Sequence, residues 1–151
     1  MRPERARLQN ICRELDIGEA VEWLGDVSMS SLAEKYNRCD VFCLPSVQEG
    51  FGIVFLEAMA AGKPIVAARA AAISELVRSG ILVETDNPGA LAEAIVCLYR
   101  DPDLRHALAS AGLRDVEQFE MSRVAARFLS ELAKIAPGLR PETLRAVTAK
   151  T

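Results

Sequence analysis

The sequence predicts an α/β protein of three layers, in which helices cover both faces of a mostly parallel β-sheet. Short apolar runs alternate along the chain with longer stretches of helical periodicity, an order typical of doubly wound sheets. The runs at residues 41–44 and 65–68 are continuously apolar, as strands covered on both faces require. Between them, a loop with two glycines leads into an apolar helical stretch, which predicts a strand, a tight turn and a helix in direct succession.

The part of the chain before this turn predicts two helices and a short strand, besides the apolar run already named. Apolar residues recur at helical spacing over residues 4–15, and Gly18 is expected to supply the left-handed cap after this helix. Residues 21–24 predict the short strand. Ser28 is a candidate N-cap for a helix that continues through Tyr36.

The part of the chain after the turn predicts further helices and strands in alternation. A helix over residues 52–61 is expected to end at Gly62, because Pro64 follows and cannot continue it. The elements expected next are a strand at 65–68, a helix at 72–79, a strand at 81–83, and helices at 88–99, 102–114 and 121–135. Residues 1–136 are therefore expected to form one domain, and residues 137–151 a C-terminal tail.

Composition and charge argue against several classes of function. The 18 Lys and Arg residues are outnumbered by 21 Asp and Glu, whereas non-specific nucleic-acid binding needs a basic surface. No apolar run reaches the length of a membrane span, and no signal peptide opens the chain. We therefore expect a cytoplasmic protein, either free or peripheral to the inner face of a membrane, that binds no nucleic acid.

The cysteines and the single histidine predict no metal site. No two of Cys12, Cys39, Cys43 and Cys97 form a Cys-x-x-Cys pair, which zinc sites commonly use. Free, buried thiols are the expected state. His106 lies in a helical stretch of alternating charge, so a solvated position is favoured over a catalytic base.

Two glutamates flank the glycine turn (residues 50–52) and are the candidate site residues. Glu49 lies on the loop, and Glu57 lies eight positions later inside a helix that is apolar nearly all round. Such a helix is normally buried, so a carboxylate in it needs a partner or an opening. Both acids can then face one cleft at the carboxyl end of the strand, where open parallel sheets bind ligands. Residue type alone favours a blander interpretation, in which both glutamates are solvated.

The turn and its flanks form one continuous segment, Pro45-Ser46-x-x-Glu49-Gly50-Phe51-Gly52-x-x-x-x-Glu57-Ala58-Met59-Ala60-x-Gly62-x-Pro64-Ile65-Val66-Ala67. This segment resembles the signature of the group 1 (family 4) retaining nucleotide-sugar glycosyltransferases, in which two glutamates are separated by seven residues. The similarity covers roughly residues 4–135. It implies a Rossmann-like three-layer α/β/α domain with a mostly parallel sheet, corresponding to part of one half of a GT-B fold.

The resemblance also implies roles for the residues of the segment. The donor would be a UDP- or GDP-linked hexose, with no metal and no other cofactor. Glu49 would be the catalytic residue and contact hydroxyls of the donor sugar, either as nucleophile or as electrostatic stabiliser. Glu57 would accept hydrogen bonds from the ribose hydroxyls. The backbone N–H groups of Gly50, Phe51 and Gly52 would lie near the sugar and the diphosphate, because a helix start favours anions.

Two departures from the family pattern bear on these roles. Full-length members have two Rossmann-like domains, and this sequence resembles the second of them. By that resemblance, the first two strands of the second domain and the family's basic phosphate-binding residues are expected to be absent here. Those strands would lie between residues 21–24 and 41–44, so we expect either direct pairing of these two segments or a partner chain that fills the gap. The glycines that usually follow the next strand are replaced by alanine at residues 70–72, and alanine takes positive φ less freely.

Two functions remain in competition at this point. In the first, the chain is the donor-binding half of a retaining hexosyltransferase, and the acceptor half either lies on a partner chain or belongs to a part of the protein outside this sequence. In the second, it is a catalytically inactive, truncated remnant that binds nucleotide weakly or acts as an interaction module. The intact pair of glutamates favours the first function, and the missing strands and phosphate-binding residues favour the second.

Overall fold

The computed structural model describes residues 3–47 and 50–135 of the chain. The chain divides into two compact units, Met1–Glu34 and Lys35–Thr151. The tail expected at residues 137–151 lies outside the described residues. Among the helices that are described, none has both the length and the apolar character that a bilayer crossing requires.

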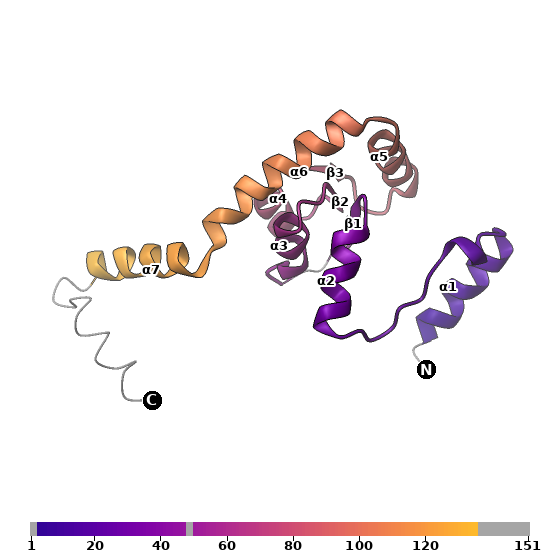
Figure 1. Cartoon of the computed structure of the whole chain (residues 1–151), viewed down its shortest axis with the longest axis horizontal. Coiled ribbons are helices and arrows are strands. Elements are labelled where there is room, and N and C mark those ends of the chain that lie inside the picture. The colour runs from indigo at the N-terminus through magenta and orange to yellow at the C-terminus, as the bar shows by residue number, and fades with distance from the viewer. Residues whose placement is uncertain (1–2, 48–49, 136–151) are drawn as a thin grey trace. The chain divides into compact units, whose positions relative to one another are not determined.

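The first unit contains helix α1 (Pro3–Glu14), which is labelled in Figure 1, and the short 3-10 helix η1 (Gly18–Ala20). The helix expected over residues 4–15 is therefore confirmed. Its left-handed cap was assigned to the wrong residue, because Asp16 has φ 54° whereas Gly18 begins η1. Aspartate tolerates the left-handed region better than most residues, since its short polar side chain bonds locally.

The strand expected at residues 21–24 is wrong, because these residues have no regular secondary structure. A strand needs a neighbour to satisfy its N–H and C=O groups, and the described part of this unit contains no other strand. The next helix, α2 (Met29–Arg38), begins where the sequence predicted. Ser28 caps it, since the Ser28 hydroxyl accepts a hydrogen bond from the Ser31 N–H at 3.2 Å.

The second unit contains a parallel sheet of three described strands, in the order β1 (Phe42–Leu44), β2 (Ile65–Ala68) and β3 (Gly80–Val83). Phe42 pairs with Ile65 across the first ladder, and Ile65 with Gly80 across the second. Two parallel neighbours surround β2, and all four of its residues are buried. The continuous apolar run at residues 65–68 therefore predicted this central strand correctly.

The first strand is the edge of this described sheet, so the expectation of a fully buried strand there is wrong. Phe42 and Leu44 are half-buried and Cys43 is exposed. Among the described strands β1 pairs with β2 alone, which rejects direct pairing with residues 21–24. Completion of the edge by a partner chain stays a prediction.

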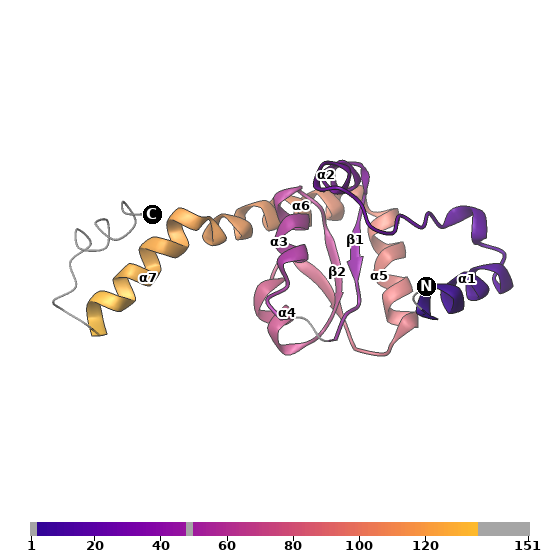
Figure 2. The ribbon, with the colours of Figure 1, turned by 90° about the horizontal axis from the view of Figure 1, so that it is seen from below.

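Helices cover both faces of the sheet, as the α/β class predicts. Helix α3 (Ile53–Ala60) and helix α4 (Ala71–Leu76) pack on one face, and helix α5 (Pro88–Arg100) packs on the other (Figure 2). The remaining described elements are α6 (Pro102–Val116), η2 (Glu117–Phe119) and α7 (Met121–Ile135). Asn87 caps α5 ahead of Pro88, because its side-chain oxygen accepts a hydrogen bond from the Ala90 N–H at 3.0 Å.

The alternating side chains of β2 divide the core of this unit in two. Ile65 and Ala67 pack with the buried side chains of α3 and α4, among them Phe55 and Met59. Val66 points to the other face and packs with Leu98 of α5 and its buried neighbours. The four cysteines are free, as expected, but none is fully buried, and Cys43 and Cys97 are exposed.

Candidate functional site

The glycine turn has a backbone geometry that requires a glycine at its last position. Gly52 is the N-cap of α3 and adopts the left-handed conformation, with φ 74° and ψ 38°. A Cβ atom on Gly52 would lie 3.0 Å from Leu76 Cδ2 and 3.1 Å from Phe55 Cδ2. The close packing and the positive φ both exclude a side chain here.

At the start of α3, the N-cap Gly52 makes no side-chain cap hydrogen bond. A glycine N-cap offers no side-chain oxygen to the first-turn N–H groups, which other helices of this chain bind with Asn87 and Asp101. The turn follows β1 through the loop at its carboxyl end. Free N–H groups at a helix start attract anions, so this end of α3 suits a phosphate or carboxylate ligand.

Glu57, on the second turn of α3, is half-buried and has a specific partner. The Tyr36 hydroxyl of α2 donates a hydrogen bond to Glu57 Oε2 at 3.0 Å. The same hydroxyl lies 3.4 Å from the carbonyl oxygen of Val54, one turn earlier in α3. The sequence predicted that this carboxylate needs a partner or an opening, and the Tyr36 phenol is such a partner.

The Tyr36 side chain is held by aromatic packing that runs from α2 through β1 to α3. Its ring lies 5.7 Å from the ring of Phe42, and Phe42 meets Phe55 edge-on at 5.8 Å. Partial burial, together with the hydrogen bond to the Glu57 carboxylate and the negative charge of that carboxylate, raises the pKa of Tyr36 to about 12. Tyr36 is therefore a neutral hydrogen-bond donor throughout the physiological pH range.

An open cavity of about 400 Å³ borders Glu57 between α3 and the end of α6. Its lining residues are Leu56, Glu57, Ala60, Val116, Glu117, Phe119 and Glu120. The ring of Phe51 in the glycine turn meets Phe119 edge-on, so η2 contacts both this cavity and the turn. Arg123 pairs with Glu117 at 3.4 Å and with Glu120 at 3.7 Å, which offsets part of the negative charge there.

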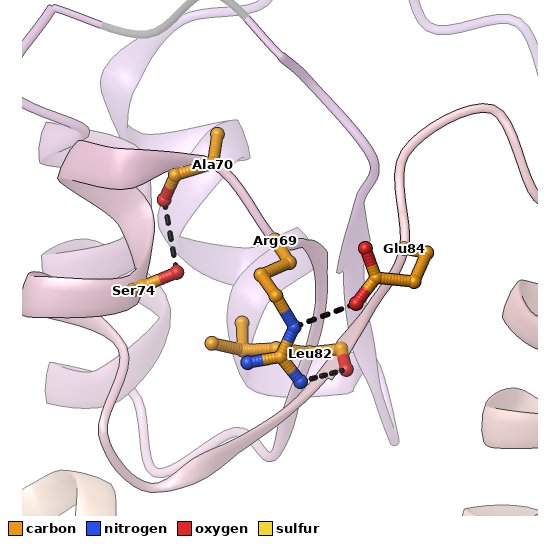
Figure 3. Close-up of polar contacts among 5 residues, drawn as sticks. All are labelled: Arg69, Ala70, Ser74, Leu82 and Glu84. Atoms are coloured by element: carbon orange, nitrogen blue, oxygen red, sulfur yellow. Dashed lines mark hydrogen bonds and ion pairs between the residues drawn. The ribbon is translucent and has the colours of Figure 1, made fainter.

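A second cavity, of about 340 Å³, lies at the carboxyl ends of the strands. Its lining residues are Pro45, Ala68, Val83, Glu84, Asp86, Asn87, Pro88 and Leu91. Beside it, Arg69 joins the ends of β2 and β3 (Figure 3): its Nε donates to Glu84 at 2.9 Å, and its Nη2 donates to the Leu82 carbonyl at 3.2 Å. Open parallel sheets bind ligands at this end.

The alanines that replace the expected glycines after β2 are accommodated without strain. Ala70 has an extended backbone, with φ −118°, and Ala71 begins α4. The Ser74 hydroxyl donates to the Ala70 carbonyl at 3.0 Å, which fixes the start of that helix (Figure 3). Neither Ala70 nor Ala71 needs the positive φ that favours glycine.

The predicted site residues are only partly open to a structural test. Glu49 lies outside the described residues, so its proximity to Glu57 stays a prediction. Gly50 and Phe51 are exposed, and Gly52 is buried. Within residues 3–47 and 50–135, no group of three or more His, Cys, Asp or Glu side chains is placed to hold a metal ion.

Tyr36 and Phe119 are site residues that sequence reasoning missed. Tyr36 lies 21 positions before Glu57, and only the packing of α2 against β1 brings the two together. Phe119 follows α6 in a segment whose pattern predicted only the end of a helix. A carboxylate in a buried helix indicates that a hydrogen-bond donor must lie nearby, but it does not indicate which residue supplies that donor.

Comparison with known proteins places the chain in a family. The family model described as "Glycosyl transferases group 1" matches residues 2–115. The chain belongs to the group 1 glycosyltransferases. The resemblance inferred from the segment around the glycine turn is therefore confirmed.

Relatives and solved structures extend this result. The phosphatidyl-myo-inositol mannosyltransferase of Mycobacterium leprae is 36% identical over 122 residues, which cover 78% of this chain and 33% of the relative. The C-terminal domain of the group 1 protein LpcC from Francisella tularensis superposes with a TM-score of 0.71 at 24% identity, over 78% of this chain and 63% of that one. Anabaena HepE in complex with UDP-glucose superposes with a TM-score of 0.76 at 27% identity, over 85% and 36%.

These similarities describe one part of a larger architecture. This group 1 chain spans about a third of the length of the curated relatives that it matches. The parallel sheet of three described strands, flanked by helices, has the α/β arrangement of a GT-B C-terminal domain. The predicted fold class is therefore confirmed.

Proposed function

We propose that this group 1 chain binds a nucleoside diphosphate hexose and is the donor-binding half of a retaining hexosyltransferase. The observation that carries the proposal is Glu57, a half-buried carboxylate on the helix whose start at Gly52 is open to an anion. An ionised carboxylate only accepts hydrogen bonds, which suits the two hydroxyls of a ribose. The UDP-glucose complex of HepE supports this class of donor.

The remaining residues of the segment take the parts of the reaction nearest the sugar. Transfer breaks the bond between the sugar and the diphosphate. Negative charge therefore develops on the leaving diphosphate, and positive charge develops on the sugar ring. The N–H groups of Gly50, Phe51 and Gly52 would stabilise the diphosphate. Glu49, which lies outside the described residues, would contact hydroxyls of the donor sugar.

A further segment, on a partner chain or elsewhere in a longer protein, completes the proposed enzyme. It supplies the acceptor domain and a strand along the open edge of β1, where Cys43 is exposed. Closure between the two halves would exclude water from the sugar. The isolated chain is therefore expected to bind the donor without transferring its hexose.

The open edge of β1 also favours a second candidate function. A chain that lacks a neighbour for this strand would serve as a catalytically inactive module, which binds nucleotide weakly or associates with another protein. Exposed strand edges are common sites of association. The two functions differ in their affinity for the donor and in their dependence on Glu57.

Calorimetric titration with UDP-glucose and with GDP-mannose separates the two functions. We expect saturable heat with one donor and at least tenfold weaker binding in Glu57→Ala, the loss that follows from a hydrogen-bonded carboxylate. Glu93→Ala, at an exposed position of α5, is the matched control and should bind as the wild type does. No heat with either donor would support the inactive module instead.

A further inference from the structure

Tyr36 is the group that fixes the direction of the Glu57 carboxylate. Its hydroxyl occupies one acceptor position of Oε2 at 3.0 Å. A carboxylate has about four such positions, so the others remain chemically able to accept hydrogen bonds from a ligand. Val54 O, at 3.4 Å, is a second acceptor for the same hydrogen and draws the phenol toward the backbone of α3.

The Tyr36 ring is positioned before any ligand arrives. It packs against Phe42 of β1, which in turn packs edge-on against Phe55 of α3. Glutamate has several rotamers when it is free, and an unheld side chain would lose that freedom on binding. Through this contact, Glu57 is ordered on folding instead.

We infer that Tyr36 is a positioning residue, which holds the Glu57 carboxylate for the ribose of the nucleotide and so favours ribonucleotides over deoxyribonucleotides. The inference rests on the proposed function, because it assigns Tyr36 a part in the donor site. A purely structural role for the phenol would stabilise the protein without any dependence on the ribose hydroxyls. The two roles can therefore be separated by the ligand.

The test compares UDP with 2′,3′-dideoxyuridine diphosphate, which lacks both ribose hydroxyls. We expect Tyr36→Phe to weaken UDP binding about 3- to 10-fold, as loss of one hydrogen bond implies, and to change dideoxy-UDP binding less than twofold. The variant keeps the ring and its packing and removes the hydroxyl alone. Tyr99→Phe, at the other tyrosine, which is 79% exposed on α5, is the matched control and should leave both affinities unchanged.

A parallel titration of Glu57→Ala distinguishes failure of this inference from failure of the proposed function. If Glu57→Ala weakens UDP selectively while Tyr36→Phe affects both ligands equally or neither, the inference is overturned and the ribose role of Glu57 stands. The same comparison uses GDP and its 2′,3′-dideoxy form if GDP-mannose is the donor that binds. If Glu57→Ala does not separate the two ligands, or the wild type gives no heat with either UDP or GDP, both are overturned. Circular dichroism at the titration temperature checks that each variant is folded.

Discussion

The ring of Phe51 meets the ring of Phe119 edge-on, with centroids 6.3 Å apart and planes at 82°. Phe51 is 63% exposed, whereas Phe119 is half-buried against the core beneath α3. The contact joins the glycine turn to the junction between α6 and α7. A change at that junction is therefore expected to reach the turn, although the two are distant in sequence.

The first prediction concerns Phe119. Phe119→Ala should lower the free energy of unfolding by about 2 kcal/mol, because it removes a partly buried ring and its aromatic contact. Phe119→Leu keeps most of the apolar volume and should cost about 1 kcal/mol. Urea unfolding measures both variants. Wild-type stability in the alanine variant would show that the contact is not formed in solution.

The second prediction concerns the backbone of the glycine turn. Gly52→Ala should lower the free energy of unfolding by about 2 kcal/mol, since alanine is strained at φ 74° and its Cβ would crowd Leu76 and Phe55. Gly50→Ala is the matched control, because a Cβ there meets nothing within 4 Å and should cost less than about 0.5 kcal/mol. Equal stabilities in urea would contradict the assigned turn geometry.

The third prediction concerns the cap of α5. Asn87→Ala should cost about 1 kcal/mol, because it removes the acceptor for the Ala90 N–H. Asn87→Ser retains a capping oxygen and should stay close to the wild type. Thermal and urea unfolding together measure the difference, and indistinguishable alanine and serine variants would refute the cap.

The fourth prediction concerns the pH dependence that Tyr36 confers. Its pKa is raised from 10.0 to about 12, so the folded state holds the phenol proton more tightly than the unfolded state does. The resulting stabilisation is complete below pH 10 and is lost as the pH rises through about 12. The titration of Tyr36 is measured as the difference in phenolate absorbance between the wild type and Tyr36→Phe. Its midpoint should lie near pH 12. A midpoint near pH 10 would indicate that the phenol is neither desolvated nor hydrogen-bonded to Glu57.

The fifth prediction concerns the open edge of β1. Cys43 is exposed there, and desolvation by its neighbours raises the pKa of its thiol, so labelling by a maleimide should accelerate as the pH rises above 9.0. Mass spectrometry locates the label, and Cys43→Ser removes that site. A partner chain that covers the edge should protect Cys43 and leave Cys97 reactive. Unchanged labelling of Cys43 in such a complex would place the partner elsewhere.

The comparison of sequence with structure shows which features depend on local pattern. The central strand β2 was predicted to the residue, because four continuous apolar residues follow a proline and are covered on both faces. Residues 21–24, three of which are apolar, were also predicted as a strand but form none, because pairing depends on neighbours that a local pattern does not reveal. The start of α5 was also predicted correctly, because Asn87 and Pro88 are residues typical of a helix N-terminus.

The candidate site was predictable to the same extent. Glu57 was identified from its apolar surroundings, since a carboxylate in such a helix needs a partner. Tyr36 was not, because the two residues are 21 positions apart and no periodic signal in the sequence links a phenol of one helix to an acid of another. The role of Glu49 stays a prediction, because it lies outside the described residues.

The central place of β2 has a consequence for how the second unit opens. Alone among the described strands it has a hydrogen-bonded neighbour on each side, and its side chains join the two halves of the core. Its amide protons should therefore exchange with deuterium only when the whole unit unfolds, whereas those of β1 exchange through smaller fluctuations. Binding of a partner along β1 would slow amide exchange in that strand as well. The residues whose exchange slows on binding would then identify the contact without a crystal structure of the complex.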